Sequence, residues 1–430
     1  MQRMQAIEDP HAGHVDVQPG IARLEHLLAR GEHADKDAVR DAYLALTDAE
    51  LTSSGLNAYR MNLLSLFGEH WTRDRIDAVA RGAAISKLWL GWEYHHHYLP
   101  GLGKSPGEAQ LKNVPVDLVK AQLGRGRGLV AATFHQGHFR YIPSDLAHAG
   151  VSLCIPLAAD SFGNYKTARD ANPDAALWNH LDFTNVEDRR GALTLARLMA
   201  KGGCVFAAID GNTGIDGPRG EHRRGSIHVL GTEVRVKDGL VRMAARFGAP
   251  ILPVFAHTID GERVCHTAPL IDPGEPLHGD EAEAFVESAM REIYARFGEN
   301  LLAHAGEWSG GDLFHQWRVP GAAASRGIED VQRELSQRLA SDGGRAVLNP
   351  RRMVELSRAN DNDQVWTDAV TLRCYRFPEE MRALVERLRS DCGVDIDWLD
   401  RHEAQTRSRF WRFLCELASR DAVLAHGGER

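Results

Sequence analysis

One histidine follows directly on a predicted strand. Residues 129–140 read LVAATFHQGHFR, so that His135 comes just after a short apolar run and Gly137 allows a sharp backbone turn. Side chains just past the carboxyl end of a parallel strand face the crevice where such sheets bind their ligands. An imidazole in that crevice can serve as a general base. The alternative is a histidine with a purely structural role at the strand end.

A carboxylate is expected near the same place. The apolar run CVFAAI is followed by Asp210. If this run is also a parallel strand, Asp210 faces the same crevice as His135 and can orient its imidazole. Asp145 and Asp160 are the other candidates, although Asp145 reaches the strand ends only if the chain bends at Pro143.

Short apolar runs alternate with helical patterns through the middle of the chain. Strands are expected at residues 129–134, 152–157, 204–209, 251–256 and 264–269. Helices are expected between them at residues 190–201, 237–247 and 281–297. This alternation predicts an α/β fold with a mostly parallel central sheet flanked by helices.

The pattern changes on both sides of this core. Helical spacing up to about Lys120 predicts an N-terminal helical subdomain, residues 1–120, before the α/β core of residues 121–320. The sequence GAAAS after Pro320 predicts a linker, and residues 326–430 are expected to form a small C-terminal α+β domain. Its expected strands are residues 353–356 and 364–375, and its expected helices are residues 378–389 and 406–419.

The composition narrows the possible classes of protein. A net charge of -8 argues against a surface built wholesale for nucleic acid, DNA included, and leaves open a local basic patch. No apolar run reaches the roughly 20 residues of a membrane span, and residues 1–20 lack the pattern of a signal peptide. The six cysteines form no CxxC pair and none has metal-ligand spacing with a histidine. We therefore expect a cytoplasmic protein with reduced thiols.

Two further patterns have residue types found in cofactor or metal sites. Three consecutive histidines, His95 to His97, lie in a predicted helix, where consecutive side chains point around the axis and cannot share one face as metal ligands. Gly126 and Gly128 are followed neither by a dinucleotide fingerprint nor by the Lys-Ser/Thr of a P-loop. We expect no metal and no cofactor.

The His135 segment resembles the His-x-Gly-Asn-Trp-Glu motif of the lauroyl and myristoyl acyltransferases of lipid A biosynthesis, within the wider lysophospholipid acyltransferase-like superfamily. His135 and Gly137 match the motif directly, while His138 and Phe139 take the asparagine and tryptophan positions. Further similar segments follow in order over residues 57–319: NAYRMNLLSLFG at 57–68, IDGN at 209–212, GSIHVLG at 225–231, GAPILPV at 248–254, EW at 307–308 and HQW at 315–317.

The resemblance implies a chemistry for these residues. In that family the histidine takes the proton of the acceptor hydroxyl, which attacks the thioester of an acyl carrier protein or coenzyme A. Gly137 and His138 are then expected at the substrate, and Asp210 to Asn212 with Arg223 and Arg224 at the donor. The alternative for Arg219, Arg223 and Arg224 is an exposed, solvated loop.

The sequence departs from the motif at its acidic position, which holds Arg140. A guanidinium cannot accept a hydrogen bond, so Arg140 cannot orient the imidazole. Three explanations are open: another acid replaces it, with Asp210 the first choice; the acceptor is an amine, a better nucleophile than an alcohol; or the site is degenerate. Arg140 itself can bind a phosphate of the donor or a carboxylate of the acceptor as a fixed cation.

The C-terminal part resembles the winged-helix-like peptide-clasp domain known from pyrroloquinoline-quinone biosynthesis. The resemblance is carried by MVEL at 353–356, by VWTD at 365–368 and by the last helix up to Leu417. It implies binding of a leader peptide as an added strand. The alternatives are a packing or dimerisation appendage, or a domain that binds a carrier protein or RNA.

We therefore expect a transferase that moves an acyl group from an acyl carrier protein or acyl-CoA to a hydroxyl or amine of a small molecule or peptide, in specialised metabolism. Two rivals are a degenerate, acyltransferase-like binding protein and an enzyme of aminoacyl transfer from charged tRNA. If the protein transfers an aminoacyl group from tRNA, a set of basic residues is expected to contact the phosphates of the tRNA. These are Arg125, Arg127, Arg219, Arg223 and Arg224.

Overall fold

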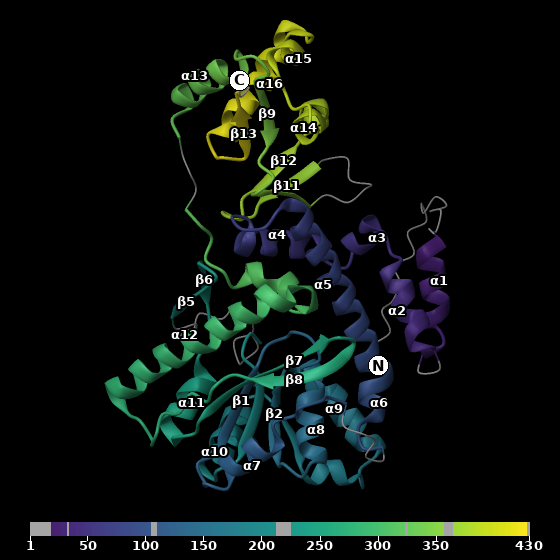
Figure 1. Ribbon diagram of the computed structural model, residues 1–430, viewed down its shortest axis with the longest axis vertical. Coiled ribbons are helices and arrows are strands. Elements are labelled where there is room, and N and C mark those ends of the chain that lie inside the picture. Colours follow the sequence, from purple (N-terminus) through teal and green to yellow (C-terminus); the bar gives the residue numbers. More distant parts are fainter. Residues whose placement is uncertain are drawn as a thin grey trace.

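The computed structural model describes residues 19–31, 34–104, 110–211, 225–322, 326–356 and 364–427. Its centre is a six-stranded mixed sheet in the order β3-β2-β4-β1-β7-β8 (Figure 1). These strands are β1 (Leu129–Thr133), β2 (Leu153–Leu157), β3 (Leu181–Asn185), β4 (Cys204–Ala208), β7 (Ile251–Ile259) and β8 (Glu262–Thr267). All run parallel except β8, which pairs antiparallel with β7. The predicted α/β fold is confirmed.

The sheet differs from the predicted one at its two edges. β3 was not predicted, because its sequence LDFTN carries polar residues on an edge strand and lacks a continuous apolar run. At the other edge, β7 extends to Ile259 and turns through Asp260 and Gly261 into β8. The left-handed φ angles of these two residues, 52° and 80°, permit this tight hairpin.

Helices cover both faces of the sheet, because side chains of alternate strand residues point to opposite faces. One face packs Leu129, Ala131 and Phe206 against α7 (Val116–Leu123), α8 (Tyr141–His148) and α9 (Ala159–Ala171). The other face packs Val130, Ala132 and Val205 against three further helices. These are α10 (Arg189–Ala200), α11 (Gly239–Phe247) and α12 (Gly279–His304), and they correspond to the predicted helices 190–201, 237–247 and 281–297.

The N-terminal helices share the core of this second face. They are α1 (Pro19–Leu28), α2 (Lys36–Leu44), α3 (Asp48–Thr52), α4 (Leu56–Phe67) and α5 (Arg73–Glu93), whereas Leu99 of α6 (Leu99–Gly101) packs on the first face. Buried residues of α4 and α5, such as Tyr59, Leu63 and Ile76, belong to the same hydrophobic cluster as Val130 of β1. The predicted boundary near residue 120 stays a prediction. Between α5 and α6, the three histidines lie in a π-helical turn, Tyr94–Tyr98.

Short elements connect the larger ones. A hairpin of β5 (Ser226–Val229) and β6 (Thr232–Arg235) packs on α12. Short 3-10 turns occur at η3 (Ala176–Asn179), η4 (Ala305–Glu307), η5 (Gly311–Gln316) and η6 (Glu379–Met381). The turns η4 and η5 lie beside α5 and α4, far apart from them in sequence.

The C-terminal part has its own hydrophobic cluster, built from residues between Val331 and Val423. Its elements are α13 (Ile328–Leu339), β9 (Arg345–Leu348), β10 (Met353–Glu355), β11 (Gln364–Asp368), β12 (Cys374–Phe377), α14 (Arg382–Arg389), α15 (Ile396–Asp400), α16 (Ala404–Ala418) and β13 (Val423–His426). β10, β11 and β12 form one antiparallel sheet, and β9 pairs with β13.

The single strand predicted at residues 364–375 is wrong, because the chain reverses between β11 and β12. The carboxylate of Asp368 accepts hydrogen bonds from the Val370 backbone N–H and the Thr371 hydroxyl, both at 2.8 Å. Leu372 then takes a left-handed φ of 58°. An Asp that bonds its own following backbone favours such a turn over a continued strand.

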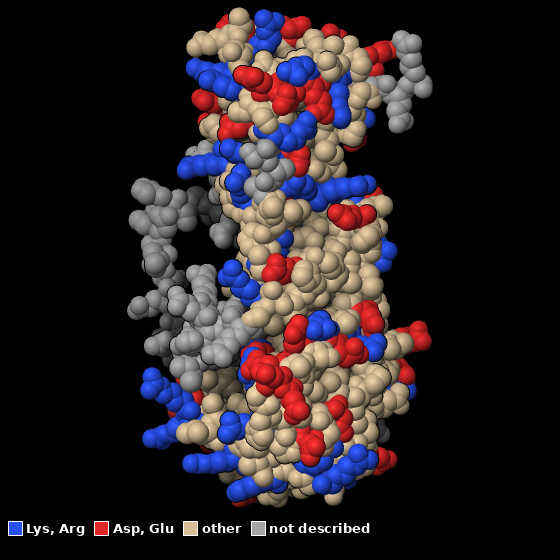
Figure 2. All heavy atoms as spheres, turned by 90° about the vertical axis from the view of Figure 1, so that its left-hand side faces the viewer, with Lys and Arg blue, Asp and Glu red and all other residues tan. Residues whose placement is uncertain are grey.

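Figure 1 shows the C-terminal part at one end of the molecule and the central sheet at the other, with α4 and α5 between them. Arg73 of α5 donates to the Pro350 and Met353 carbonyls, both at 3.2 Å. On the face shown in Figure 2, Lys and Arg side chains are interspersed with Asp and Glu. Among the residues that the model describes, no helix is long and apolar enough to cross a membrane.

Candidate active site

The site forms where two neighbouring parallel strands end. β1 and β4 pair in register, with Thr133 opposite Ala208. His135 and Asp210 each follow two residues after these positions, so the sheet brings them side by side although 75 residues separate them in sequence. The predicted position of His135 at a carboxyl strand end is therefore correct.

The predicted partner of His135 is also in place. The Nδ1 atom of His135 lies 2.8 Å from Oδ1 of Asp210, and the backbone N–H of His135 lies 3.1 Å from each carboxylate oxygen. Three contacts from one residue fix the carboxylate, and an Nδ1–H that donates to it fixes the tautomer with an unprotonated Nε2. An imidazole in this state is ready to accept a proton at Nε2.

The imidazole is accessible but held in position. The side chain of His135 is 37% exposed and that of Asp210 is 15% exposed, so a substrate can reach the ring while the carboxylate is largely covered. Phe139 packs edge-on against the ring at 5.1 Å. A side chain at Gly211 would come within 3.5 Å of the ring atom Cε1, so the glycine leaves this side of the imidazole open.

A segment distant in sequence holds the backbone of His135. The carbonyl of His135 accepts hydrogen bonds from the Gly310 backbone N–H at 3.0 Å and from the Ser309 hydroxyl at 2.9 Å. Tyr59 of α4 donates its hydroxyl proton to the Ser309 carbonyl at 2.9 Å. Asn62 of the same helix donates to the Gly311 carbonyl at 2.6 Å. The family-like segment 57–68 thus contacts the chain between the family-like segments 307–308 and 315–317, and that chain in turn holds the backbone of His135.

Gly137 makes the turn that follows the histidine. Its φ is 56°, and a Cβ atom there would lie 2.1 Å from the Ala256 carbonyl oxygen, so only glycine fits. Its N–H donates to the Glu307 carbonyl, and the next N–H, that of His138, donates to the Ala256 carbonyl. These bonds anchor the turn to the end of β7.

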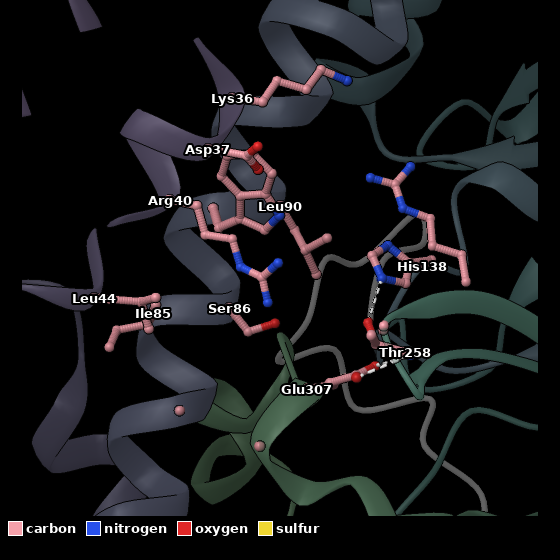
Figure 3. A pocket seen from close by; sticks show the side chains of 16 residues that line it. Lys36, Asp37, Arg40, Leu44, Ile85, Ser86, Leu90, His138, Thr258 and Glu307 are labelled. Carbon is pink, nitrogen blue, oxygen red and sulfur yellow. Dashed lines mark hydrogen bonds between the residues drawn. The ribbon is translucent and has the colours of Figure 1, made fainter. Parts of the chain in front are cut away.

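His138 directly follows the turn at Gly137. Its side chain is buried, and its Nε2 atom lies 3.0 Å from the Thr258 hydroxyl (Figure 3). Burial, reinforced by the charge of Arg263, lowers the pKa of His138 to about 4. The ring is therefore neutral at neutral pH and can act as a hydrogen-bond partner, but it is not a second cation.

Arg140 has no contact with the ring of His135 and packs against aromatic side chains instead. Its guanidinium carbon lies 4.8 Å from the Tyr94 ring centre and 4.7 Å from that of Phe139. Burial lowers its pKa from the ordinary value, but a guanidinium stays charged. No carboxylate of the described residues forms an ion pair with it. Its position is consistent with the expectation that Arg140 does not orient the base.

The other two candidate acids lie elsewhere. Asp145 is buried in α8, where its carboxylate accepts a hydrogen bond from the Leu111 backbone N–H at 2.8 Å. The second-choice role of Asp145 as partner of His135 is therefore wrong: α8 carries it away from the strand ends and onto the chain before α7. Asp160 is exposed in the first turn of α9.

Several predicted residues fall outside the part that the model describes. These are Asn212, Arg219, Arg223 and Arg224, in the segment 212–224 that follows Asp210. Of the remaining basic residues, Arg127 lies at the amino end of β1. It donates hydrogen bonds to the Gly248 carbonyl and forms an ion pair with Asp272. Arg127 thus lies at the amino ends of the strands, whereas His135 lies at their carboxyl ends.

The sequence did not predict a polar network around Glu307. Its carboxylate accepts hydrogen bonds from the Thr258 backbone N–H at 3.0 and 3.3 Å and lies 3.2 Å from Nδ1 of His257. Burial alone raises the pKa of Glu307, but these contacts more than offset it and lower the pKa below its ordinary value. The only signal in the sequence was the family-like pair Glu307-Trp308.

His257, His304 and Glu307 lie close enough together to be considered as metal ligands. The two rings of His257 and His304, however, stack with centres 4.0 Å apart and planes within 8°. Both nitrogens of His257 already face oxygen atoms, those of Glu307 and Asn300, each at 3.2 Å. We therefore treat these residues as a support for the turn at Gly137.

No protein-family model matches this chain, and no curated protein matches its sequence. The likeness to the lipid A acyltransferases consequently stays a hypothesis that rests on the motifs and on the geometry around His135.

Proposed function

We propose that the protein is an acyltransferase related to the lipid A late acyltransferases, with His135 as its general base and Asp210 as the residue that orients it. The observation that carries this proposal is the 2.8 Å contact between His135 Nδ1 and Asp210 Oδ1 at the carboxyl edge of a parallel sheet. A carboxylate supplied by a neighbouring strand takes over the task that Arg140 cannot perform.

In the proposed reaction, Nε2 of His135 takes the proton of an acceptor hydroxyl or amine as the acceptor oxygen or nitrogen attacks the thioester carbonyl. The tetrahedral intermediate collapses with cleavage of the carbon–sulfur bond. The departing thiolate takes the proton back from the imidazolium and leaves as the thiol of coenzyme A or of an acyl carrier protein. Asp210 stabilises the imidazolium during these two proton transfers.

Arg140 is proposed to bind an anionic group of one substrate, either a donor phosphate or an acceptor carboxylate. Arg140 is three residues beyond Gly137. The ring of Phe139 contacts both the His135 ring and the Arg140 guanidinium, so the guanidinium lies close to the base. A cation that no described carboxylate neutralises favours an anion from outside. Asn212, Arg223 and Arg224 remain proposed donor-site residues on sequence grounds.

The two rival functions receive less support. A degenerate binding protein was expected to leave His135 unpaired, whereas the histidine contacts Asp210. Aminoacyl transfer from tRNA would require the basic residues of the core to lie on the same surface as His135. Arg127, however, forms an ion pair with Asp272 at the amino ends of the strands, away from His135. Acceptor and donor are therefore proposed to be a small molecule or peptide and a thioester, in the cytoplasm.

The decisive experiment is thiol release from acyl-CoA and acyl carrier protein thioesters in the presence of candidate hydroxyl and amine acceptors. His135→Ala should abolish acceptor-dependent thiol release, because it removes the proposed proton acceptor, while the melting temperature stays close to that of the wild type. His148→Ala, an exposed histidine in α8, is the matched control and should retain full activity. Turnover by His135→Ala at the wild-type rate would refute the proposal.

A further inference from the structure

The support segment, residues 309–312 at the start of η5, packs directly against His135 and Asp210. Gly310 donates its backbone N–H to the His135 carbonyl at 3.0 Å, and Ser309 donates its hydroxyl to the same oxygen at 2.9 Å. A Cβ atom on Gly310 would lie 3.1 Å from Cβ of His135 and 3.3 Å from Oδ2 of Asp210. Both distances are shorter than ordinary van der Waals contacts, so a side chain at this position would displace the pair or the segment.

The backbone conformation of Gly310 does not require a glycine. Its φ of −86° and ψ of −3° are those of the third residue of a type I turn, which residues with side chains adopt readily. Gly137, in contrast, has a left-handed φ of 56°. The missing side chain at Gly310 is therefore explained by the space that His135 and Asp210 occupy, and not by the backbone.

Helix α4 holds the support segment through two buried side chains. Tyr59 donates its hydroxyl to the Ser309 carbonyl at 2.9 Å, and Asn62 donates to the Gly311 carbonyl at 2.6 Å. Both side chains are fully buried. Burial, reinforced by the charge of Asp312, raises the pKa of Tyr59, so its hydroxyl keeps its proton over any ordinary range of pH. These bonds connect α4 through Ser309 to the carbonyl of the histidine.

We propose that Gly310 and Tyr59 are positioning residues that set the contact between Nδ1 of His135 and the carboxylate of Asp210. Gly310 leaves room for the pair, and Tyr59 acts through Ser309. A general base must lie within hydrogen-bond reach of the proton that it takes, and a displacement of about 1 Å can cost on the order of 100-fold in rate. The effect on catalysis rests on the proposed acyl transfer, whereas the effect on the contact does not.

Proton NMR of the full chain measures this contact without a substrate. A proton on Nδ1 of His135 that is held by a carboxylate resonates far downfield of the backbone amides, because the hydrogen bond is charge-assisted. Its loss in His135→Ala and Asp210→Asn assigns the signal. Gly310→Ala should shift or remove it, because the added methyl group displaces the pair. Gly306→Ala is the matched control: a Cβ atom there meets no atom within 4 Å, so the signal should stay unchanged.

Tyr59→Phe removes only the hydroxyl that binds Ser309, and Tyr43→Phe is its control. Tyr43 of α2 is buried in the same hydrophobic cluster but does not bond to Ser309. In the thiol-release assay, Gly310→Ala should lower kcat by roughly tenfold or more and Tyr59→Phe by about threefold, both at nearly constant KM. A purely structural role would lower the melting temperature and leave both kcat and the NMR signal as they are.

The proposal is overturned if the wild type lacks the downfield signal, or if Gly310→Ala and Tyr59→Phe change it no more than their controls do. Tyr59→Phe alone decides the matter if Gly310→Ala does not fold. The two proposals fail separately. If the wild type transfers no acyl group but the variants shift the signal, the proposed function falls and the positioning of His135 stands. If acyl transfer depends on His135 but both variants keep the wild-type kcat, only the positioning role falls.

Discussion

At the scale of single residues, Asp210 carries the most specific prediction. Asp210→Asn keeps the shape of the side chain, but an amide in place of the carboxylate no longer stabilises the imidazolium and can select the wrong tautomer of His135. By analogy with serine-protease triads, we expect a loss of kcat on the order of 10⁴. The measurement is acceptor-dependent thiol release under saturating substrate.

Asp160→Asn is the control for this experiment, because Asp160 is exposed at the start of α9 and was the other acid considered for the role. It should retain wild-type activity. If both aspartate variants are fully active while His135→Ala is inactive, the imidazole works without an orienting carboxylate. That result would favour an amine acceptor, which needs less assistance than an alcohol.

Arg140 leads to a different kinetic prediction. Arg140→Ala should raise the KM of the substrate that carries the bound anion by about tenfold, with a smaller effect on kcat, because binding and not proton transfer is impaired. Steady-state kinetics with each substrate varied in turn identifies which one is affected. Arg169→Ala is the matched control, since Arg169 also stacks on an aromatic ring, that of Phe183 at 4.5 Å, in another part of the sheet. A loss confined to kcat would contradict the binding role.

At the scale of secondary-structure elements, the turn between β11 and β12 depends on a buried ion pair. Asp368 is 1% exposed and pairs with Arg352. Burial by itself raises the pKa of Asp368, but the hydrogen bonds from Arg352, Val370 and Thr371 outweigh it and lower the pKa. Asp368→Asn leaves Arg352 without its main partner and should cost about 3–5 kcal/mol in the free energy of unfolding.

The difference in unfolding free energy between the wild type and Asp368→Asn should depend on pH, because the pKa of Asp368 is lowered in the folded state. A carboxylate with a lowered pKa in the folded state stabilises the fold above its unfolded pKa, and this contribution disappears as the pH falls through the folded pKa. Urea unfolding of the wild type and of Asp368→Asn should therefore differ most near pH 7 and converge in strong acid. A difference that is as large in strong acid as at pH 7 would show that charge plays no part.

At the scale of the whole molecule, the C-terminal part has a hydrophobic core of its own and also packs against the rest of the chain. Its hydrophobic cluster is its own, but Val354 and Ala369 belong to the cluster of the central sheet. The buried Arg318 donates to the carbonyls of Ala369 and Val370. Removal of the C-terminal part would therefore leave a buried guanidinium and an apolar patch on α4 exposed to solvent.

We expect a chain that ends at Ala322 to fold cooperatively but to melt several degrees lower than the full chain, because the sheet keeps its helices and loses only the contacts of α4, Arg73 and Arg318 with the C-terminal part. Differential scanning calorimetry of both chains measures the difference. Arg318→Gln in the full chain should produce part of the same loss. Aggregation of the shortened chain without a cooperative transition would show that the two parts form a single folding unit.

The sequence alone was sufficient for the elements that bear the site. The runs at 129–134 and 204–209 are apolar except for Thr133, as is typical of buried parallel strands, and the carboxyl ends of parallel strands lie on the same side of the sheet. For that reason the pairing of His135 with Asp210 could be predicted although Arg140 occupies the acidic position of the motif. Gly137 could likewise be assigned to a sharp turn, because glycine adopts backbone conformations that other residues avoid.

Only the tertiary structure decided which distant groups complete the site. Nothing in the sequence near Ser309 and Gly310 indicates that they bind the carbonyl of His135, and nothing near Tyr59 indicates that its hydroxyl binds the carbonyl of Ser309. Asp145 was misplaced for the same reason, since the direction of α8 depends on its packing against the sheet. Strand patterns are set by local sequence, whereas the approach of segments far apart in the chain is set by how their apolar faces pack together.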